Sequence, residues 1–157
     1  MYSLKEILDL AVQMEQAGFE FYTECGARFS GEIYQEIFHY LADQEKNHKK
    51  KFEELQKNIF KNKSDSSEDY FRYMKSLGGD RIFKKHSINE IQNIVKTPHD
   101  ALLKGIEDEK NSIFYYTEIK NAYSSGSDES LILDEIISEE RSHIMKLDLV
   151  LTKITAL

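Results

Sequence analysis

Four long segments of the chain carry apolar residues at alternating steps of three and four positions. This spacing places the apolar side chains along one face of an α-helix. We therefore predict helices over about residues 3–27, 31–60, 98–123 and 128–155. Ser3 with Glu6 forms a capping-box pattern at the start of the first helix, and Thr97, Pro98 and Asp100 mark the start of the third.

The segment between the second and third predicted helices, about residues 61–97, lacks this long periodicity. It contains, in order, a polar run, an aromatic patch, a glycine turn and a second capping-box pattern: residues 61–68, Tyr70, Phe71 and Tyr73, Gly78-Gly79-Asp80, and Ser87 with Glu90. We interpret it as a crossover with one or two short helices, able to return along helices of about 40 Å. The predicted fold is all-α, a four-helix bundle of two helical hairpins joined by a long crossover, in one domain over residues 1–157.

Acidic and histidine residues interrupt each of the four apolar faces near its middle. A lone glutamate does so in the first and third helices, and a Glu-x-x-His motif in the second and fourth. The interrupting residues are Glu15, Glu45, His48, Glu109, Glu140 and His143. Because a single Glu-x-x-His motif is common on solvated helix surfaces, only the combination across four helices is informative.

The two halves of the chain repeat one another. Residues 15–24 read EQAGFEFYTE and residues 109–118 read EKNSIFYYTE, an offset of 94 positions. The Glu45-x-x-His48 motif recurs as Glu140-x-x-His143, an offset of 95. Each half is therefore a helix with a lone glutamate and a tyrosine seven residues later, a turn, and a helix with Glu-x-x-His.

The turns fix the level of these motifs within each hairpin. In an antiparallel helix pair, residues that face each other lie about equally far from the turn. The glutamates of the first hairpin are centred on Ser30, and those of the second between Ser124 and Ser125, where turn residues cluster. Stacking the two hairpins would then bring four carboxylates and two imidazoles to one depth of the core.

A buried group of four carboxylates needs positive charge, because burying an uncompensated carboxylate costs several kcal/mol or more. No lysine or arginine interrupts the apolar faces. Two divalent ions would supply the charge, and this ligand set is that of carboxylate-bridged dimetal bundles. Oxygen-rich donors with some imidazole favour iron, with manganese and zinc as alternatives. We predict two metal ions bound by Glu15, Glu45, His48, Glu109, Glu140 and His143; the alternative is a hydrogen-bonded polar core without metal.

Other polar residues near the motifs have more ordinary interpretations. Glu20, Glu107 and Glu139 are rotated off the apolar faces and are predicted to lie on the surface. Tyr22 and Tyr116 lie two turns beyond a glutamate, where core packing and a hydrogen bond to a ligand carboxylate are equally consistent with the pattern. Three further histidines match no repeat and are predicted to have no role in the site: His39, His86 and His99.

Composition restricts the class of protein. The 157 residues suit one domain with a real core. The single cysteine, Cys25, excludes an internal disulfide and a four-thiolate iron site, and we expect it to be buried in a protein of the reducing cytoplasm. The N-terminal residues lack a signal-peptide pattern, and no apolar run approaches the roughly 18 residues of a membrane span. A net charge of -7 disfavours nucleic acid and membrane as partners.

These residues resemble the rubrerythrin-like branch of the ferritin-like diiron carboxylate proteins over nearly the whole chain. The resemblance rests on Glu15 with Tyr22, LADQEKNH at 41–48, Glu109 with Tyr116, and EERSH at 139–143. It implies a ferritin-like bundle with six iron ligands at the residues named above, bridged by the glutamates of the two Glu-x-x-His motifs. Rubrerythrins also have a four-cysteine rubredoxin domain, absent from these residues, and a further glutamate where this sequence has Ser112.

The function predicted from this pattern is a diiron oxidoreductase that reduces hydrogen peroxide or O2. An external electron-transfer protein is the expected donor, because the chain has neither four cysteines nor a nucleotide-binding glycine motif. A homodimer is compatible with the sequence. The alternative function is iron binding, as a ferroxidase or an iron-storage protein, and hydroxylation of an organic substrate stays open as a third.

Overall fold

The computed structural model describes residues 4–58, 68–78 and 87–156, and its regular elements are all helices. They are α1 (Leu4–Arg28), α2 (Glu32–Asn58), α3 (Glu68–Gly78), α4 (Ile88–Ile94), α5 (Pro98–Lys120) and α6 (Asp128–Thr155). The predicted all-α fold with four long helices is confirmed, as are two short helices in the crossover. The third long helix ends three residues early, because residues 121–123 make hydrogen bonds to the carbonyl three positions back, which tighten the chain into a turn.

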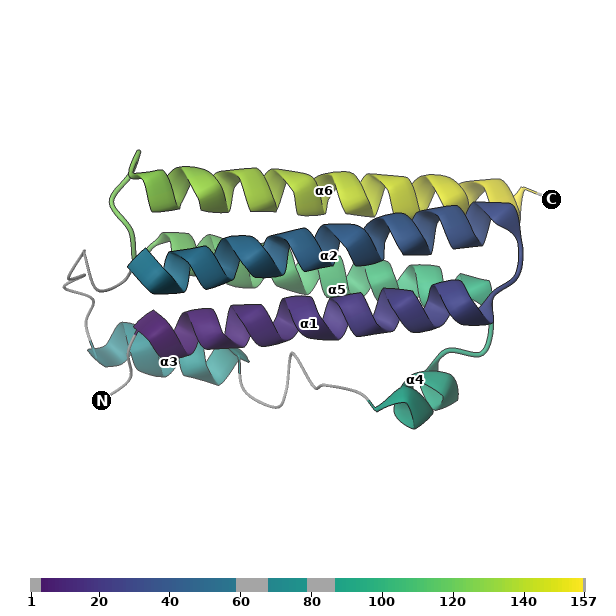
Figure 1. Cartoon of the computed structure of the whole chain (residues 1–157), viewed down its shortest axis with the longest axis horizontal. Coiled ribbons are helices and arrows are strands. Elements are labelled where there is room, and N and C mark those ends of the chain that lie inside the picture. Colours follow the sequence, from purple (N-terminus) through teal and green to yellow (C-terminus); the bar gives the residue numbers. More distant parts are fainter. Residues whose placement is uncertain (1–3, 59–67, 79–86, 157) are drawn as a thin grey trace.

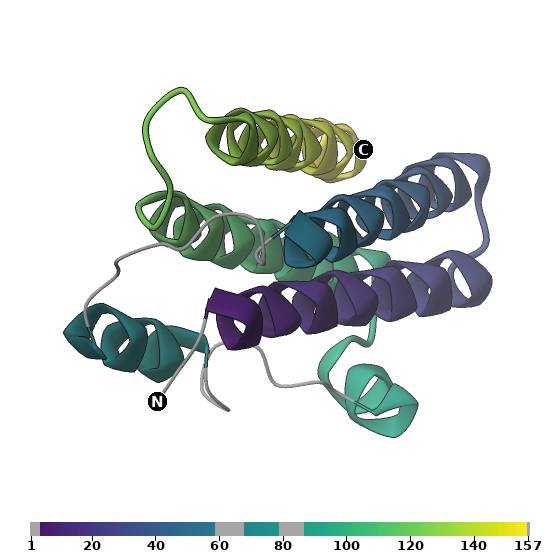
Figure 2. The ribbon, with the colours of Figure 1, turned by 60° about the vertical axis from the view of Figure 1, so that its left-hand side comes forward.

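The four long helices form two stacked antiparallel hairpins (Figure 1). Helix α1 packs along α2, and α5 packs along α6. Helices α2 and α5 run in the same direction, so the crossover must return along the length of the bundle before α5 begins (Figures 1 and 2). This topology places the middle of all four helices at the same level, as the repeat predicts.

Side-chain caps explain where several helices begin. Thr97 and Asp100 form a reciprocal capping box at the start of α5, and Ser87 and Glu90 form another at α4. The Ser127 hydroxyl accepts a hydrogen bond from a backbone amide in the first turn of α6. The starts of α4 and α5 at these capping residues were predicted. Three other predicted features lie at least partly outside the described residues: the Ser3–Glu6 pattern, the polar run over 61–68 and the turn at 78–80.

The apolar core consists of two clusters at opposite ends of the bundle. One includes Leu8, Phe52 and Leu133, and α3 adds Met74 to it. The other surrounds Phe38 and receives α4 through side chains that include Ile91. The mid-helix polar residues lie between the two clusters. Within the described residues, no helix is long and apolar enough to cross a membrane.

Candidate metal centre

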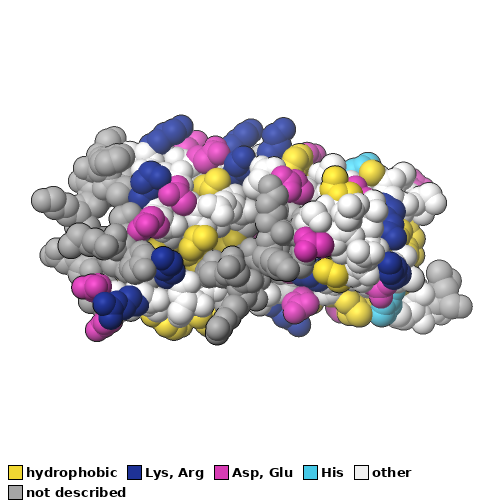
Figure 3. All heavy atoms as spheres, turned by 90° about the horizontal axis from the view of Figure 1, so that it is seen from below, with side chains coloured by type: hydrophobic (Ala, Val, Ile, Leu, Met, Phe, Trp, Pro, Cys, Tyr) yellow, Lys and Arg dark blue, Asp and Glu magenta, His cyan; other side chains and the backbone are white. Residues whose placement is uncertain are grey.

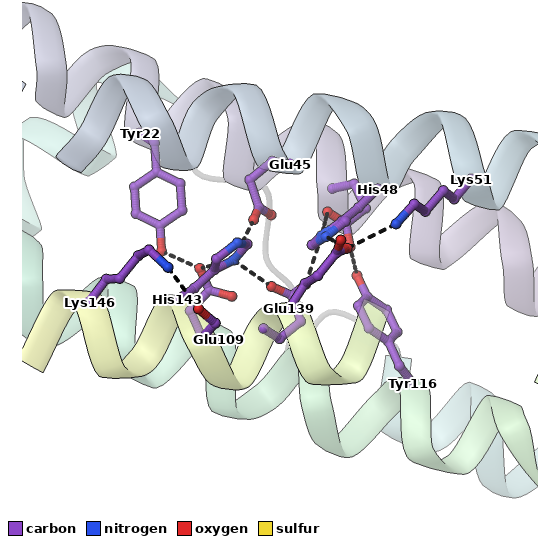
Figure 4. A network of polar contacts seen from close by, with 12 residues as sticks. Tyr22, Glu45, His48, Lys51, Glu109, Tyr116, Glu139, His143 and Lys146 are labelled. Carbon is purple, nitrogen blue, oxygen red and sulfur yellow. Dashed lines mark hydrogen bonds and ion pairs between the residues drawn. The ribbon is translucent and has the colours of Figure 1, made fainter. Parts of the chain in front are cut away.

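Six polar side chains occupy the level between the two apolar clusters, and each is at most 5% exposed. They are the six interrupting residues of the sequence pattern: Glu15, Glu45, His48, Glu109, Glu140 and His143. Helices α1 and α5 each supply one glutamate, whereas α2 and α6 each supply a glutamate and a histidine. Because Glu-x-x-His spaces its two side chains by about one helical turn, both point to the same side of the helix. Figure 4 shows the side chains from α2 and α6 reaching into one space.

Among the groups of possible metal ligands that the six residues form, two contain four residues each and overlap. One comprises Glu15, Glu45, His48 and Glu140; the other comprises Glu45, Glu109, Glu140 and His143. Within each group the ligand atoms lie within 4.8 Å of one another. The glutamates of the two Glu-x-x-His motifs belong to both groups, which is the arrangement that bridging carboxylates require.

Glu140 lies directly between the two histidines. Its Oε1 is 3.2 Å from His48 Nδ1, and its Oε2 is 2.8 Å from His143 Nδ1. Neither contact has the orientation of a hydrogen bond, since all four atoms lack a hydrogen-bond partner in the described part of the chain. The same holds for one oxygen each of Glu15 and Glu45. Buried polar atoms without partners are rare and costly, so atoms gathered around one space fit cations placed among them.

The protonation preferences of the metal-free site follow from burial and crowding. Burial raises the pKa of Glu45 and Glu109 well above the usual value, and neighbouring carboxylates add to the effect. Although burial opposes ionisation of Glu140, the adjacent imidazoles of His143 and His48 lower its pKa below the usual range. Burial disfavours charged histidines, yet the surrounding carboxylates raise the pKa of His48 to about 11 and of His143 to about 9. Without metal, the cluster therefore retains protons that metal ions would displace.

Two tyrosines connect the hairpins at this level. The Tyr22 hydroxyl from α1 donates a hydrogen bond to Glu109 Oε1 of α5 at 2.7 Å. Reciprocally, the Tyr116 hydroxyl from α5 donates to Glu15 Oε1 of α1. The sequence pattern was consistent both with core packing of these tyrosines and with hydrogen bonds to candidate ligand carboxylates. The structure shows both, since each tyrosine donates such a hydrogen bond and is buried in the core.

The family assignment agrees with this geometry. The chain matches the family model described as rubrerythrin over residues 6–150. It belongs to the rubrerythrin family. Among curated proteins and among solved structures, no match was found. Members of the rubrerythrin family are diiron carboxylate proteins, so membership implies a dimetal site, usually of iron, and the buried glutamates and histidines fit such a site.

In this rubrerythrin-family chain, Glu139 differs from the sequence prediction of a surface residue. Its side chain is 35% exposed, but its Oε2 lies 2.8 Å from His48 Nε2. A carboxylate accepts hydrogen bonds, so Nε2 carries the proton and Nδ1 faces the cluster. Lys51 Nζ donates to the same oxygen at 2.9 Å. The prediction asked only whether a residue faces the bundle axis. Glu139 lies beside the apolar face of α6 and points toward the neighbouring helix α2.

The remaining predicted residues are placed as follows. Glu107 is exposed, as expected, and Glu20 is half-buried and accepts a hydrogen bond from Gln16. His39 and His99 are exposed, and His86 lies outside the described residues. Cys25 is buried, and burial raises the pKa of its thiol to about 12, which keeps the sulfur protonated and inert.

Gly18 is a residue that sequence reasoning missed. A Cβ atom there would lie 2.4 Å from Glu45 Oε2, so any larger residue would displace this carboxylate. A glycine inside a long helix, one turn after Glu15, was the available signal, because interior glycine weakens a helix by roughly 1 kcal/mol. Its repeat-related position, 94 residues later, is Ser112, and both residues line a cavity beside the site.

Proposed function

We propose that this chain binds two iron ions through Glu15, Glu45, His48, Glu109, Glu140 and His143, and reduces hydrogen peroxide or O2 with electrons from an external donor. The observation that supports it is the set of buried, unpartnered ligand atoms in two groups that share Glu45 and Glu140. A polar core without metal would leave these atoms unsatisfied in the described part of the chain, at a cost of about 1–3 kcal/mol each.

Each part of the chain has a defined role in this proposal. Glu45 and Glu140 contribute to both metal positions and are assigned as bridges. Glu15 and Glu109 are terminal ligands, each held by a tyrosine hydroxyl from the opposite hairpin. The histidines complete the two sets. When bound, a pair of Fe(II) ions supplies two electrons to an oxygen substrate.

An outside reductant must then restore the metals. These 157 residues contain one cysteine, which is buried, so they do not themselves form a four-thiolate electron-transfer centre. We expect an electron-transfer protein in this role, and we expect the protein to act in the cytoplasm. The proposed metal site does not depend on either of these two expectations.

The test combines metal analysis with rapid kinetics. Protein purified without chelator should contain two metal ions per chain and an absorption band of a carboxylate-bridged diiron site. The Fe(II) form should be oxidised once by peroxide or O2, and should cycle only with an added electron donor. Oxidation by O2 much faster than by peroxide, with no donor-dependent turnover, would instead indicate the ferroxidase or storage function. No oxidation by either would disprove the redox function.

A further inference from the structure

A cavity of about 80 Å³ lies between α1, α4 and α5 and reaches the cluster at Glu45 and Glu109. Helix α4 contributes lining residues to one side of it. This short helix packs against α1, beside the four long helices (Figure 2). Glu45 belongs to both groups of possible ligands, whereas Glu109 belongs to the second group alone, and Glu15 and His48 of the first group are not among the lining residues. The cavity therefore reaches the second group at Glu109.

The walls of the cavity are mainly apolar away from the cluster. Met14 and Phe21 contribute from α1, and Ile91, Ile94 and Val95 contribute from α4 and the residue after it. A water molecule needs only about 10–15 Å³ of such space, so the cavity is several times larger than O2 or hydrogen peroxide requires. Hydrogen peroxide, a small polar molecule, also gains little from an apolar wall of this extent.

The polar groups of the cavity gather where it meets α5 and the cluster. Tyr22 and Glu109 form one hydrogen-bonded pair there, and Lys104 and Asp108 form an ion pair on α5. Ser112 leaves room in the wall because its side chain is small. The cavity thus combines an apolar chamber with one polar end at the metal ligands, as expected for a ligand with an apolar body and one polar head.

We propose that this cavity binds an organic hydroperoxide, ROOH, with a compact alkyl or aryl body. The body lies against Phe21, Ile91 and Val95, and the peroxide group lies at the Glu45–Glu109 end. This inference rests on the proposed function, since the metal pair supplies the electrons. Reduction of ROOH would break its O–O bond and consume two electrons, which a pair of Fe(II) ions held by the six residues would supply, and two protons taken up from the solvent; the products are ROH and H2O. The external electron donor restores both Fe(II).

The first test compares substrates and a variant that fills the cavity. The Fe(II)-loaded chain is mixed in stopped flow with cumene hydroperoxide and, separately, with hydrogen peroxide. Ser112→Leu should slow oxidation by cumene hydroperoxide about 10-fold or more and leave oxidation by hydrogen peroxide nearly unchanged. Ala17→Leu, on the opposite wall, is the second variant. Ser76→Leu, the same substitution at an exposed position of α3, is the matched control and should change neither rate.

The second test needs no redox chemistry. The alcohol 2-phenyl-2-propanol, the product of cumene hydroperoxide, is titrated into the metal-free chain while methyl NMR signals are followed. Signals of Ile91 and Val95 should shift, and Ser112→Leu should abolish the shift. If hydrogen peroxide oxidises the metals but the alcohol shifts no cavity methyl and Ser112→Leu alters neither rate, the hydroperoxide assignment is wrong and the proposed function stands. If cumene hydroperoxide, hydrogen peroxide and O2 all leave the metals reduced, both the hydroperoxide assignment and the proposed function fail.

Discussion

The two ligand groups are related by the internal repeat, yet their surroundings differ. In the first group, His48 Nε2 contacts Glu139, and Lys51 holds that carboxylate in place. In the second, His143 Nε2 has no hydrogen-bond partner among the described residues, and the Tyr40 ring lies about perpendicular to the imidazole, with ring centroids 6.0 Å apart. The repeat thus keeps the candidate ligands and changes the residues that contact them.

The sequence positions behind this difference are easily traced. Glu139 directly precedes the fourth-helix glutamate, and the repeat-related position before Glu45 is Gln44. Lys51 has its counterpart in Lys146, which donates to Ser142 and lies over the Tyr40 ring instead. A carboxylate behind a metal-binding histidine fixes the tautomer and strengthens the ligand. We therefore expect the Glu15–His48 position to bind metal more tightly than the Glu109–His143 position, which also faces the cavity.

The largest effect is expected where the two groups meet. Glu140→Ala or Glu45→Ala removes a ligand from both positions, so metal content should fall from two ions per chain to nearly none. Plasma emission analysis of the purified variants measures this directly. Glu107→Ala, on the exposed side of α5, is the control and should retain both metals. If either bridge variant keeps one metal at full occupancy, that glutamate is not shared.

Metal removal should produce the next largest change, and its size should depend on pH. In the metal-free fold, Glu45 and Glu109 have raised pKa values, so the folded state holds protons that the unfolded state releases above 4.5. The contributions of His143 and His48 are complete below pH 6.5; that of His143 is lost as pH rises through its pKa of about 9, and that of His48 through its pKa of about 11. The stability of the metal-free fold should therefore fall as pH rises.

Metal binding has the opposite pH dependence, because the ligands must lose their protons. Melting curves with metal and with chelator should thus separate more at about pH 8 than at about pH 5, where saturating metal adds a few kcal/mol or less. Circular dichroism at both pH values measures the two melting temperatures. A difference that is larger at the lower pH would contradict the predicted protonation of the carboxylate cluster.

A smaller effect should follow from exchanging the residues that distinguish the groups. Glu139→Gln makes α6 resemble α2 at this position and should weaken the tighter metal position roughly 10–100-fold. Gln44→Glu is the matched reverse change and should strengthen the weaker position. Calorimetric titration with Zn(II), which needs no redox control, resolves the two binding steps. Equal and unchanged steps in both variants would show that the outer carboxylate does not distinguish the positions.

The sequence predicts the residues that face the bundle axis better than those that face a single neighbouring helix. The six clustered residues were predicted because each interrupts an apolar helical face, and periodicity shows such interruptions directly. Glu139 and Gly18 were missed, since their roles depend on which helix lies beside them and on the space between side chains. The sequence pattern also did not predict the cavity, because the cavity depends on how the short helix α4 packs on α1. Periodicity identifies residues that face the bundle axis, but not those that face a single neighbour.

The smallest expected effect is on metal affinity when the tyrosine that contacts each ligand group is replaced by phenylalanine. Tyr116 donates to Glu15 in the first group and Tyr22 donates to Glu109 in the second. Burial raises the pKa of both hydroxyls well above the usual value, so each keeps its proton and remains a donor. Each Tyr→Phe variant should therefore lose about 0.5–1.5 kcal/mol of metal binding, a few-fold in affinity, at one position only.

The two tyrosine variants test which metal position corresponds to which Zn(II) binding step. Tyr116→Phe should weaken the tighter Zn(II) step, which the comparison gives to the Glu15–His48 position, and Tyr22→Phe should weaken the looser one. Tyr115→Phe is the control, because its hydroxyl donates a hydrogen bond to the Ile7 carbonyl at 3.4 Å. If both ligand-linked variants weaken the same step, or if the order is reversed, the supported histidine does not define the tighter position. The difference between the two groups would then lie in the cavity and not in Glu139.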